Sequence, residues 1–261
     1  MRLFTDQTGR QIEVRNEPQR IVSVVPSQTE LLADLGLEGE VAGITKFCVH
    51  PEAWFRNKTR VGGTKQLHLD KIRELKPDLI IANKEENEKE QIEELAKEFP
   101  VWISDIQTIP HALQMIQVVG QLVNRTQQAN ELVEKIVWGF NNLQRPAQPR
   151  RVAYFIWYNP WMTVGGDTFI SNVIHTIGWQ NVLANQSRYP EISLQELATH
   201  EPELVLLSSE PYPFKEKHIA EIKEVLPHAE VQLVDGEMFS WYGSRMLKAV
   251  DYMQQLVKNY I

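Results

Sequence analysis

Two patterns of hydrophobic and polar residues recur along this chain. Short apolar runs are typical of buried strands, and longer stretches with an apolar residue every three or four positions are typical of helices. The segment RIVSVVPSQTELLADLG, residues 20–36, contains both in succession. It predicts a strand, then a helix that begins at a capping box of Ser27 and Glu30 and ends at Gly36.

The same order returns in the second half, in RVAYFIWYNPWMTVGGDTFISNVIHTIG, residues 151–178. Here an apolar run is followed by an aromatic loop and by apolar residues at helical spacing. Asp167 is the predicted N-cap, and Gly178 ends the helix. The aromatic residues of this segment are therefore expected on a loop that leaves a strand.

A closer internal match links LDKIRELKPDLIIA, from Leu69, with LQELATHEPELVLL, from Leu194. The two segments share a leucine, then an isoleucine or leucine, then a proline and a second leucine. Each of these residues is separated from its counterpart by the same number of positions. Each copy predicts a short helix, a turn that contains proline, and a buried strand. The agreement with the first repeat favours two halves of related build.

The stretch between the halves is helical in pattern. Pro110 suits a first helical turn, Asn124 and Thr126 predict a stop and a restart, and apolar residues keep to one face as far as Gln144. Such a helix is stiff, in contrast to a Gly/Ser-rich linker.

These patterns predict an α/β protein with two lobes of mostly parallel sheet and flanking helices, joined by one long backbone helix. We expect an N-terminal lobe over residues 1–109, a helical segment that includes the rigid connector over 110–146, and a C-terminal lobe over 147–261.

Composition narrows the range of functions. The formal net charge of -7 includes no basic block, which argues against nucleic-acid binding. No run of about 18 apolar residues predicts a transmembrane helix. A single cysteine, Cys48, cannot form an internal disulfide. The N-terminus lacks the apolar core of a secretory signal, so a signal peptide was removed or never existed, and a cytoplasmic location stays open.

Ligands of open parallel sheets bind beyond the carboxyl ends of the strands. Aromatic residues are concentrated in the loops expected there, namely Trp157, Tyr158, Trp161, Tyr189, Tyr212, Phe214, Phe239, Trp241 and Tyr242. Any one of these rings has core packing as an alternative. The set as a whole favours a platform for a large, flat or apolar ligand, because adjacent rings of one turn cannot all face inward.

The segments PQRIVSVVPSQTELLADLGL, LDKIRELKPDLIIAN and ISLQELATHEPELVLL, with the connecting helix, resemble the substrate-binding proteins of ABC importers for cobalamin and iron-siderophore complexes. The resemblance implies two α/β lobes on a backbone helix, a ligand bound in the cleft between them, and no catalysis. It implies a monomer in the periplasm or at the cell surface, with an ABC permease as partner.

Residue by residue, the resemblance to cobalamin-binding members is mixed. His50 and Tyr189 stand where those proteins have an aromatic ligand contact, whereas Thr64 and Asn83 stand where they have tryptophans. Cobalamin or another metal chelate is the expected ligand. The predicted ligand-binding residues are Phe47, Cys48, His50, Thr64, Lys65, Asn83, Lys84, Trp157, Trp161, Tyr189, Tyr212, Trp241, Tyr242 and Arg245.

Arg245 is included because a cation is electrostatically unfavourable at the start of a helix, where it lies, so a ligand is expected to compensate it. The family's docking carboxylates for the permease map onto Asp70 and Gln195. Only the first is acidic, although Glu196 is adjacent. This departure leaves open a cytoplasmic carrier or sensor without a permease.

Two chemical alternatives carry less weight. Cys48 and His50 lie two residues apart, but closed zinc sites usually take four ligands, so no resident metal or cofactor is expected. An enzyme would need a nucleophile with a base, and Ser27 lies outside a G-x-S-x-G motif. A metal-dependent enzyme that uses Cys48 and His50 is the weakest alternative.

Overall fold

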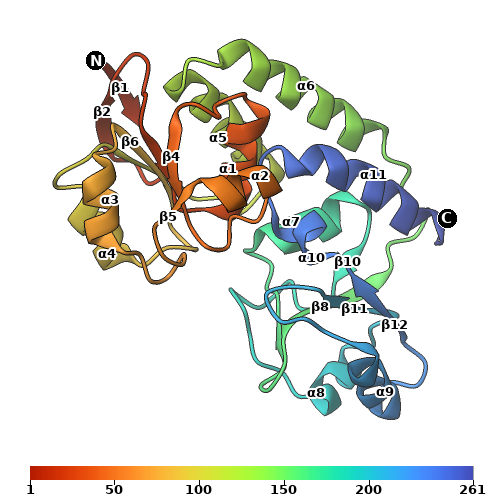
Figure 1. Ribbon diagram of the computed structural model, residues 1–261. Coiled ribbons are helices and arrows are strands. Elements are labelled where there is room, and N and C mark those ends of the chain that lie inside the picture. Colours follow the sequence, from red (N-terminus) through yellow and green to blue (C-terminus); the bar gives the residue numbers. More distant parts are fainter. Residues whose placement is uncertain (261) are drawn as a thin grey trace. The chain divides into compact units, whose positions relative to one another are not determined.

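The computed structural model describes residues 1–260, and the chain forms two compact units, which Figure 1 traces in sequence colours. Unit 1 comprises Met1–Ile106, Pro110–Lys135 and Tyr242–Arg245. Unit 2 comprises Gln107–Ile109, Ile136–Trp241 and the chain from Met246 onward.

Unit 1 is built on a parallel sheet with the strand order β5-β4-β3-β6-β7. Its strands are β3 (Ile21–Ser23), β4 (Val41–Ile44), β5 (Thr59–Arg60), β6 (Leu79–Asn83) and β7 (Val101–Ser104). The hairpin of β1 (Arg2–Thr5) and β2 (Gln11–Val14) precedes it. The central strands β3 and β6 are buried along their whole length, as expected for a sheet covered on both faces.

The helices of unit 1 follow the strands in alternation. They are α1 (Pro26–Asp34), α2 (Glu52–Asn57), α3 (Leu69–Leu75) and α4 (Lys89–Leu95). Ile72 of α3 and Ile92 and Leu95 of α4 pack into one hydrophobic cluster with Val22 and Ile80 of the sheet. This burial of apolar side chains holds α3 and α4 on one face of the sheet.

Unit 2 repeats this architecture with the strand order β10-β8-β11-β12, again parallel. The strands are β8 (Arg151–Trp157), β10 (Gln180–Asn181), β11 (Leu204–Ser208) and β12 (Glu230–Val234), and β9 (Met162–Thr163) turns back antiparallel to β8. The helices are α7 (Phe169–Thr176), α8 (Leu194–Thr199), α9 (Glu216–Val225), α10 (Gly236–Ser240) and α11 (Arg245–Lys258). Apolar residues of α8 and α9 cover one face of the sheet.

Two helices lie between the sheets in sequence, α5 (Ile109–Leu122) and α6 (Thr126–Asn142). Asn124 between them has a positive φ of 57°, which ends α5 at the predicted place. The helix α6 is continuous. Its residues up to Lys135 belong to unit 1, and those from Ile136 belong to unit 2. The predicted stop, restart and long helix are therefore present.

The internal repeat extends to the backbone conformation. Lys76 after α3 and Glu201 after α8 occupy the same place in the repeat, and both have a φ of 46°. The acidic residue two positions later accepts a hydrogen bond from a backbone N–H in both copies. Asp78 accepts a hydrogen bond from the backbone N–H of Arg20 at 2.8 Å, and Glu203 accepts one from Arg151 at 2.8 Å.

Two predicted helix caps were wrong. The N-cap of α1 is Val25, and no side chain caps that end, because Pro26 already starts the helix and Glu30 bonds elsewhere. The N-cap of α7 is Thr168, whose hydroxyl accepts from the backbone N–H of Ser171 at 3.2 Å. The carboxylate of Asp167 instead accepts from the backbone N–H of Arg188.

Candidate ligand-binding site

The carboxyl edge of the unit 2 sheet carries a continuous cluster of aromatic rings. The rings come from the last residue of β8, the loop after β8 and the loop after β11, and they are Trp157, Tyr158, Trp161, Tyr212 and Phe214. We call these five side chains the aromatic rim. The centroids of the contacting pairs lie 4.9 to 5.8 Å apart, within the range of favourable ring contacts.

The rings of the rim differ in exposure. Trp161 packs on Phe155 of the core at 4.8 Å and stacks on Phe214 at 5.8 Å, with planes 11° apart. Trp157 rests edge-on against Tyr212 and keeps 41% of its surface exposed. The adjacent rings therefore do not all face inward, as the sequence predicted: Trp157 is exposed. Trp161, in contrast, packs against neighbouring rings.

Trp241 is more buried than a ligand platform requires, with 8% of its surface exposed. Its indole Nε1–H donates to Glu210 Oε1 at 2.8 Å, and the hydroxyl of Ser240 donates to the same oxygen at 2.8 Å. Burial raises the pKa of Glu210, and these two hydrogen bonds oppose that rise. Beside Glu210, a cavity of ≈ 530 Å³ opens at the carboxyl ends of β11 and β12, and Asp235 and Glu237 also line it.

The carboxyl edge of the unit 1 sheet is polar instead. Asn83 at the end of β6 donates from its amide to Ser104 Oγ at 3.0 Å, and its carbonyl oxygen accepts from the N–H groups of Glu85 and Glu86. Asn87 donates to the carbonyl oxygens of Val24 and Thr64. The nitrogen and the oxygen of the Asn83 side-chain amide thus both form hydrogen bonds that hold the loop. The sequence prediction of a ligand contact did not include this structural role.

Cys48 is fully buried beneath this edge, as expected for a small core residue. Its sulfur lies 3.1 Å from the hydroxyls of Thr29 and Thr45. Burial raises the pKa of the thiol, so the thiolate that would bind a soft metal is disfavoured. His50 is half-buried nearby in sequence. Within residues 1–260, no three His, Cys, Asp or Glu side chains converge as metal ligands would.

The remaining predicted residues of unit 1 lie on exposed loops. Phe47 is 50% exposed, and the ammonium of Lys46 lies 5.0 Å from its ring centroid. Lys65 donates to the carbonyl oxygen of Glu85 at 2.9 Å, and Lys84 pairs with Asp105 at 2.5 Å. Of the other two candidates, Thr64 is half-buried and Tyr189 in unit 2 is half-buried beside the guanidinium of Arg188.

The reason for assigning Arg245 to a ligand was wrong. Its guanidinium is buried within unit 1, and Nε donates to Glu30 Oε2 at 2.8 Å. A carboxylate of the protein therefore compensates the cation at the start of α11. The predicted ligand residue Tyr242 is likewise buried and donates its hydroxyl to Glu86 at 2.7 Å. Burial, with the Glu86 carboxylate, raises the pKa of Tyr242 well above its ordinary value.

The predicted docking residues occupy equivalent places in the two repeats. Asp70 lies in the first turn of α3 with its side chain 94% exposed, and Arg73 donates to it at 3.1 Å. Gln195 and Glu196 lie exposed in the first turn of α8, where the N–H of Glu196 donates to the N-cap Ser193. The equivalent position therefore carries an exposed carboxylate in unit 1 and an exposed amide in unit 2.

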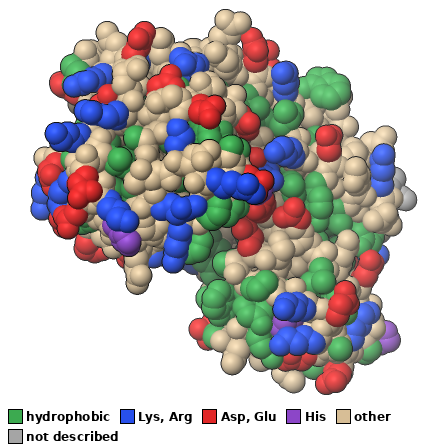
Figure 2. All heavy atoms as spheres, in the orientation of Figure 1, with side chains coloured by type: hydrophobic (Ala, Val, Ile, Leu, Met, Phe, Trp, Pro, Cys, Tyr) green, Lys and Arg blue, Asp and Glu red, His purple; other side chains and the backbone are tan. Residues whose placement is uncertain are grey.

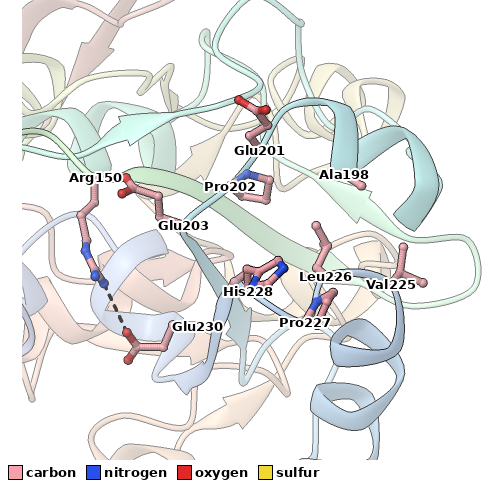
Figure 3. A pocket seen from close by; sticks show the side chains of 11 residues that line it. Arg150, Ala198, Glu201, Pro202, Glu203, Val225, Leu226, Pro227, His228 and Glu230 are labelled. Carbon is pink, nitrogen blue, oxygen red and sulfur yellow. Dashed lines mark hydrogen bonds and ion pairs between the residues drawn. The ribbon is translucent and has the colours of Figure 1, made fainter.

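A separate cavity of ≈ 620 Å³ lies at the opposite, amino edge of the unit 2 sheet (Figure 3). Arg150 pairs there with Glu230 at 3.2 Å, and Pro202, Leu226 and His228 line the wall. Its lining mixes charged and small apolar side chains. Figure 2 shows the same mixture on the visible surface, where acidic and basic side chains are interspersed and hydrophobic ones reach the surface between them.

The residues predicted from the sequence to bind a ligand did not include Glu210 and His218, which both lie near the carboxyl edge of the unit 2 sheet. His218 is in fact buried among four of the rim rings. The signal available was its place three residues after Lys215, the position from which a side chain caps a helix start.

Residues 21–234 match the family model described as periplasmic binding protein. An uncharacterized ABC transporter substrate-binding lipoprotein of Bacillus subtilis is 23% identical over 97% of this chain and 84% of that protein. A vitamin B12-binding protein of Yersinia pestis is 26% identical over 73% of this chain and 69% of that protein.

Solved structures share the fold. The periplasmic vitamin B12 binding protein of Vibrio cholerae has a TM-score of 0.75 and 20% identity, over 93% of this chain and 97% of that one. The periplasmic heme binding protein of the same organism has a TM-score of 0.78 and 22% identity, over 93% and 99%. The chain therefore belongs to the periplasmic binding protein family, and its α/β fold with two parallel sheets is that of these structures.

This assignment confirms the class of protein expected from the sequence. The relatives are binding proteins of ABC transport, so the chain is related to solute-binding components rather than to the transporter's membrane domains. None of the helices in residues 1–260 combines the length and the apolar character needed to cross a lipid bilayer.

Proposed function

We propose that this protein captures a metal chelate, with a cobalamin-like corrinoid as the first choice and heme or a ferric siderophore as the others, for delivery to an ABC permease outside the cytoplasm. The vitamin B12-binding and heme-binding relatives support the class of ligand. The observation that carries the proposal for this chain is Trp157, a tryptophan held by Tyr212 with 41% of its surface open at the carboxyl edge of a parallel sheet.

Trp157 is suited to an extended ring system for two reasons. A tryptophan presents a large apolar face at low conformational cost, and stacking on it adds to the burial of that face. Its position is also fixed by the neighbouring ring, so little order is lost when the ligand binds. In unit 1, Phe47 and Lys65 stay separate predictions of ligand contacts: the ring of Phe47 is 50% exposed, and the ammonium of Lys65 pairs with Glu88 at 3.4 Å.

The test is equilibrium binding to cyanocobalamin, hemin and ferric hydroxamate, followed by tryptophan fluorescence and by ligand absorbance retained after desalting. Trp157→Ala is expected to weaken binding of the preferred chelate at least about tenfold, about 1.4 kcal/mol. Trp138→Ala is the matched control, because Trp138 is a 70% exposed tryptophan of unit 2 on the helix α6, away from the rim. Equal affinities of both variants and the wild type would refute the proposed contact.

A second candidate is a carrier or sensor that binds the chelate without a permease. The observation that favours it is Gln195, a neutral side chain at the place in α8 where unit 1 has Asp70. Reconstituted uptake with permease complexes from the same genome separates the two functions. Stimulation of ATP hydrolysis that is lost in Asp70→Asn supports import, whereas tight chelate binding without stimulation of any permease supports the carrier.

A further inference from the structure

His218 lies behind the aromatic rim at the start of α9 and has 1% of its surface exposed. Its ring is 4.8 Å from Tyr158, 5.5 Å from Tyr212 and 5.2 Å from Phe214, centroid to centroid, with steep interplanar angles in each case. The imidazole therefore makes T-shaped contacts with several rings at once.

Hydrogen bonds hold both ring nitrogens of His218. The backbone N–H of Lys215 donates to Nδ1 at 2.9 Å, and the carbonyl oxygen of the same residue lies 3.1 Å from Nδ1. The tautomer that accepts the N–H of Lys215 carries its proton on Nε2, which lies 3.2 Å from the hydroxyl oxygen of Tyr212 and can donate to it. His218 thereby links the first turn of α9 to Tyr212.

Tyr212 in turn contacts the exposed member of the rim. Its ring lies edge-on to Trp157 at 5.7 Å, and it also contacts Tyr158 at 5.7 Å. Its backbone N–H donates a hydrogen bond to the carbonyl oxygen of Ile156 at 3.4 Å. This bond connects the loop after β11 to the end of β8. A side chain that fixes the Tyr212 hydroxyl thereby limits the orientations open to the Trp157 indole.

We propose that His218 is a positioning residue, which holds Tyr212 and, through it, sets the orientation of Trp157 for the ligand. The role in binding rests on the proposed function, in which Trp157 contacts a chelate. The positioning itself is a property of unit 2 alone. His218 does not touch the ligand in this arrangement, since it is buried beneath the rings that would.

The first test needs no ligand. Protein labelled with fluorotryptophan gives one fluorine NMR line for each tryptophan, and Trp157→Phe identifies the line of Trp157. In Tyr212→Phe and in His218→Asn, that line is expected to shift and broaden. Asparagine places an acceptor near the position of Nδ1 and keeps the bond from Lys215, but it does not reach Tyr212. Tyr252→Phe is the control, because it removes a bonded hydroxyl of unit 2 elsewhere.

The second test measures affinity for cyanocobalamin and hemin in the same variants. Each single variant is expected to lose about threefold to tenfold in affinity, and the double variant no more than the larger single loss, because both remove one hydrogen bond. His218→Gln, which restores a donor near Nε2, is expected to recover part of the loss. Partial recovery of this kind distinguishes the orientation of Tyr212 from general loosening of α9.

The outcomes separate the two proposals. An unchanged Trp157 line in both Tyr212→Phe and His218→Asn overturns the positioning role, whatever the ligand. If the line shifts but Trp157→Ala binds chelates like the wild type, the proposed ligand contact fails and the positioning of Trp157 stands as a structural property. If Trp157→Ala loses binding while both positioning variants keep full affinity, the role of His218 in binding fails.

Discussion

At the carboxyl edge of the unit 1 sheet, the side chains that follow the strands are amides, hydroxyls and carboxylates. At the same edge of the unit 2 sheet they are mainly aromatic rings. The polar groups of unit 1 bond one another, as Gln28 and Asn83 both bond Ser104, and most of them are buried. The rings of unit 2 contact one another and leave Trp157 exposed. The same fold thus supports a bonded polar edge and an apolar surface.

The difference has a physical consequence for what each edge can do. A buried polar group needs a partner inside the protein, and the side-chain nitrogens of Gln28 and Asn83 both find one in Ser104. The side-chain oxygen of Asn83 also accepts from the backbone N–H groups of Glu85 and Glu86, which fixes the backbone of that loop. An aromatic ring needs only contact, and a second face is free to receive an apolar ligand. We therefore expect mutations at the unit 1 edge to act on stability, and mutations at the exposed part of the unit 2 edge to act on binding.

The largest effect is expected for the buried ion pair of unit 1. Arg245→Ala leaves the Glu30 carboxylate buried without its guanidinium, and such a loss costs about 3–5 kcal/mol of unfolding free energy. Urea denaturation followed by circular dichroism measures this. The control is Arg56→Ala, which breaks the exposed pair with Glu52 and is expected to cost about 1 kcal/mol or less.

A double replacement sharpens this prediction. Glu30→Leu combined with Arg245→Met removes both charges and is expected to recover most of the stability lost in Arg245→Ala, because the desolvation of both ions disappears together. If Arg245→Ala unfolds at the same urea concentration as the wild type, the pair contributes little, and the contrast between a structural edge and a binding edge is not supported.

An intermediate effect is expected within the aromatic rim itself. Trp161→Ala removes a ring packed between Phe155 and Phe214 and should cost about 2–3 kcal/mol, less than a fully buried tryptophan. Trp157→Ala, at the exposed end, should cost about 1 kcal/mol or less. Thermal unfolding of the two variants in parallel measures the difference. Equal losses would mean that the exposed ring is as much a part of the core as the other.

Much of the fold could be predicted from the sequence. Hydrophobic periodicity and the proline turns predicted the strand and helix at each repeat, and Asn124 predicted the break between α5 and α6. These signals are local, because each depends on residues within one or two turns of a helix or strand.

The site was harder to predict because its contacts are distant in sequence. Glu30 and Arg245 are more than two hundred positions apart, so nothing local indicated that a carboxylate would compensate the arginine. His218 lacked neighbours at ligand spacing, and its ring contacts come from the loop after β8 as well as from the loop before α9. The neighbouring residues in the sequence could place an aromatic residue on a loop, but they could not show which rings would be buried by packing and which would stay exposed.

A smaller effect, with a defined pH dependence, is expected at Glu210. Burial raises its pKa, so the folded state binds the proton more tightly than the unfolded state does. The stabilising contribution of this group is therefore complete at acid pH and is lost as the pH rises from about 4 through the raised pKa of the folded state. Glu210→Gln keeps an oxygen that accepts from Ser240 and Trp241 without a charge. It should raise the unfolding free energy at neutral pH by about 1 kcal/mol.

The measurement is urea unfolding of wild type and variant across this pH range. The two proteins are expected to converge below about pH 4, where the glutamic acid is also neutral. A difference that is constant with pH would place the effect in packing rather than in ionisation, and a destabilised variant at neutral pH would show that the charged form of Glu210 is preferred by its partners.

The smallest effect compares the two units at one equivalent position. Lys76 and Glu201 both have a φ of 46°, which side chains with a Cβ adopt at a cost, and both side chains are exposed. Lys76→Gly and Glu201→Gly are each expected to raise the unfolding free energy by about 0.5 kcal/mol, because relief of this strain exceeds the entropy that glycine adds to the unfolded chain. Differential scanning calorimetry measures both variants. If the two units are equivalent repeats, the gains should be alike. A gain in one and a loss in the other would mean that the shared backbone conformation is held by different forces in the two copies.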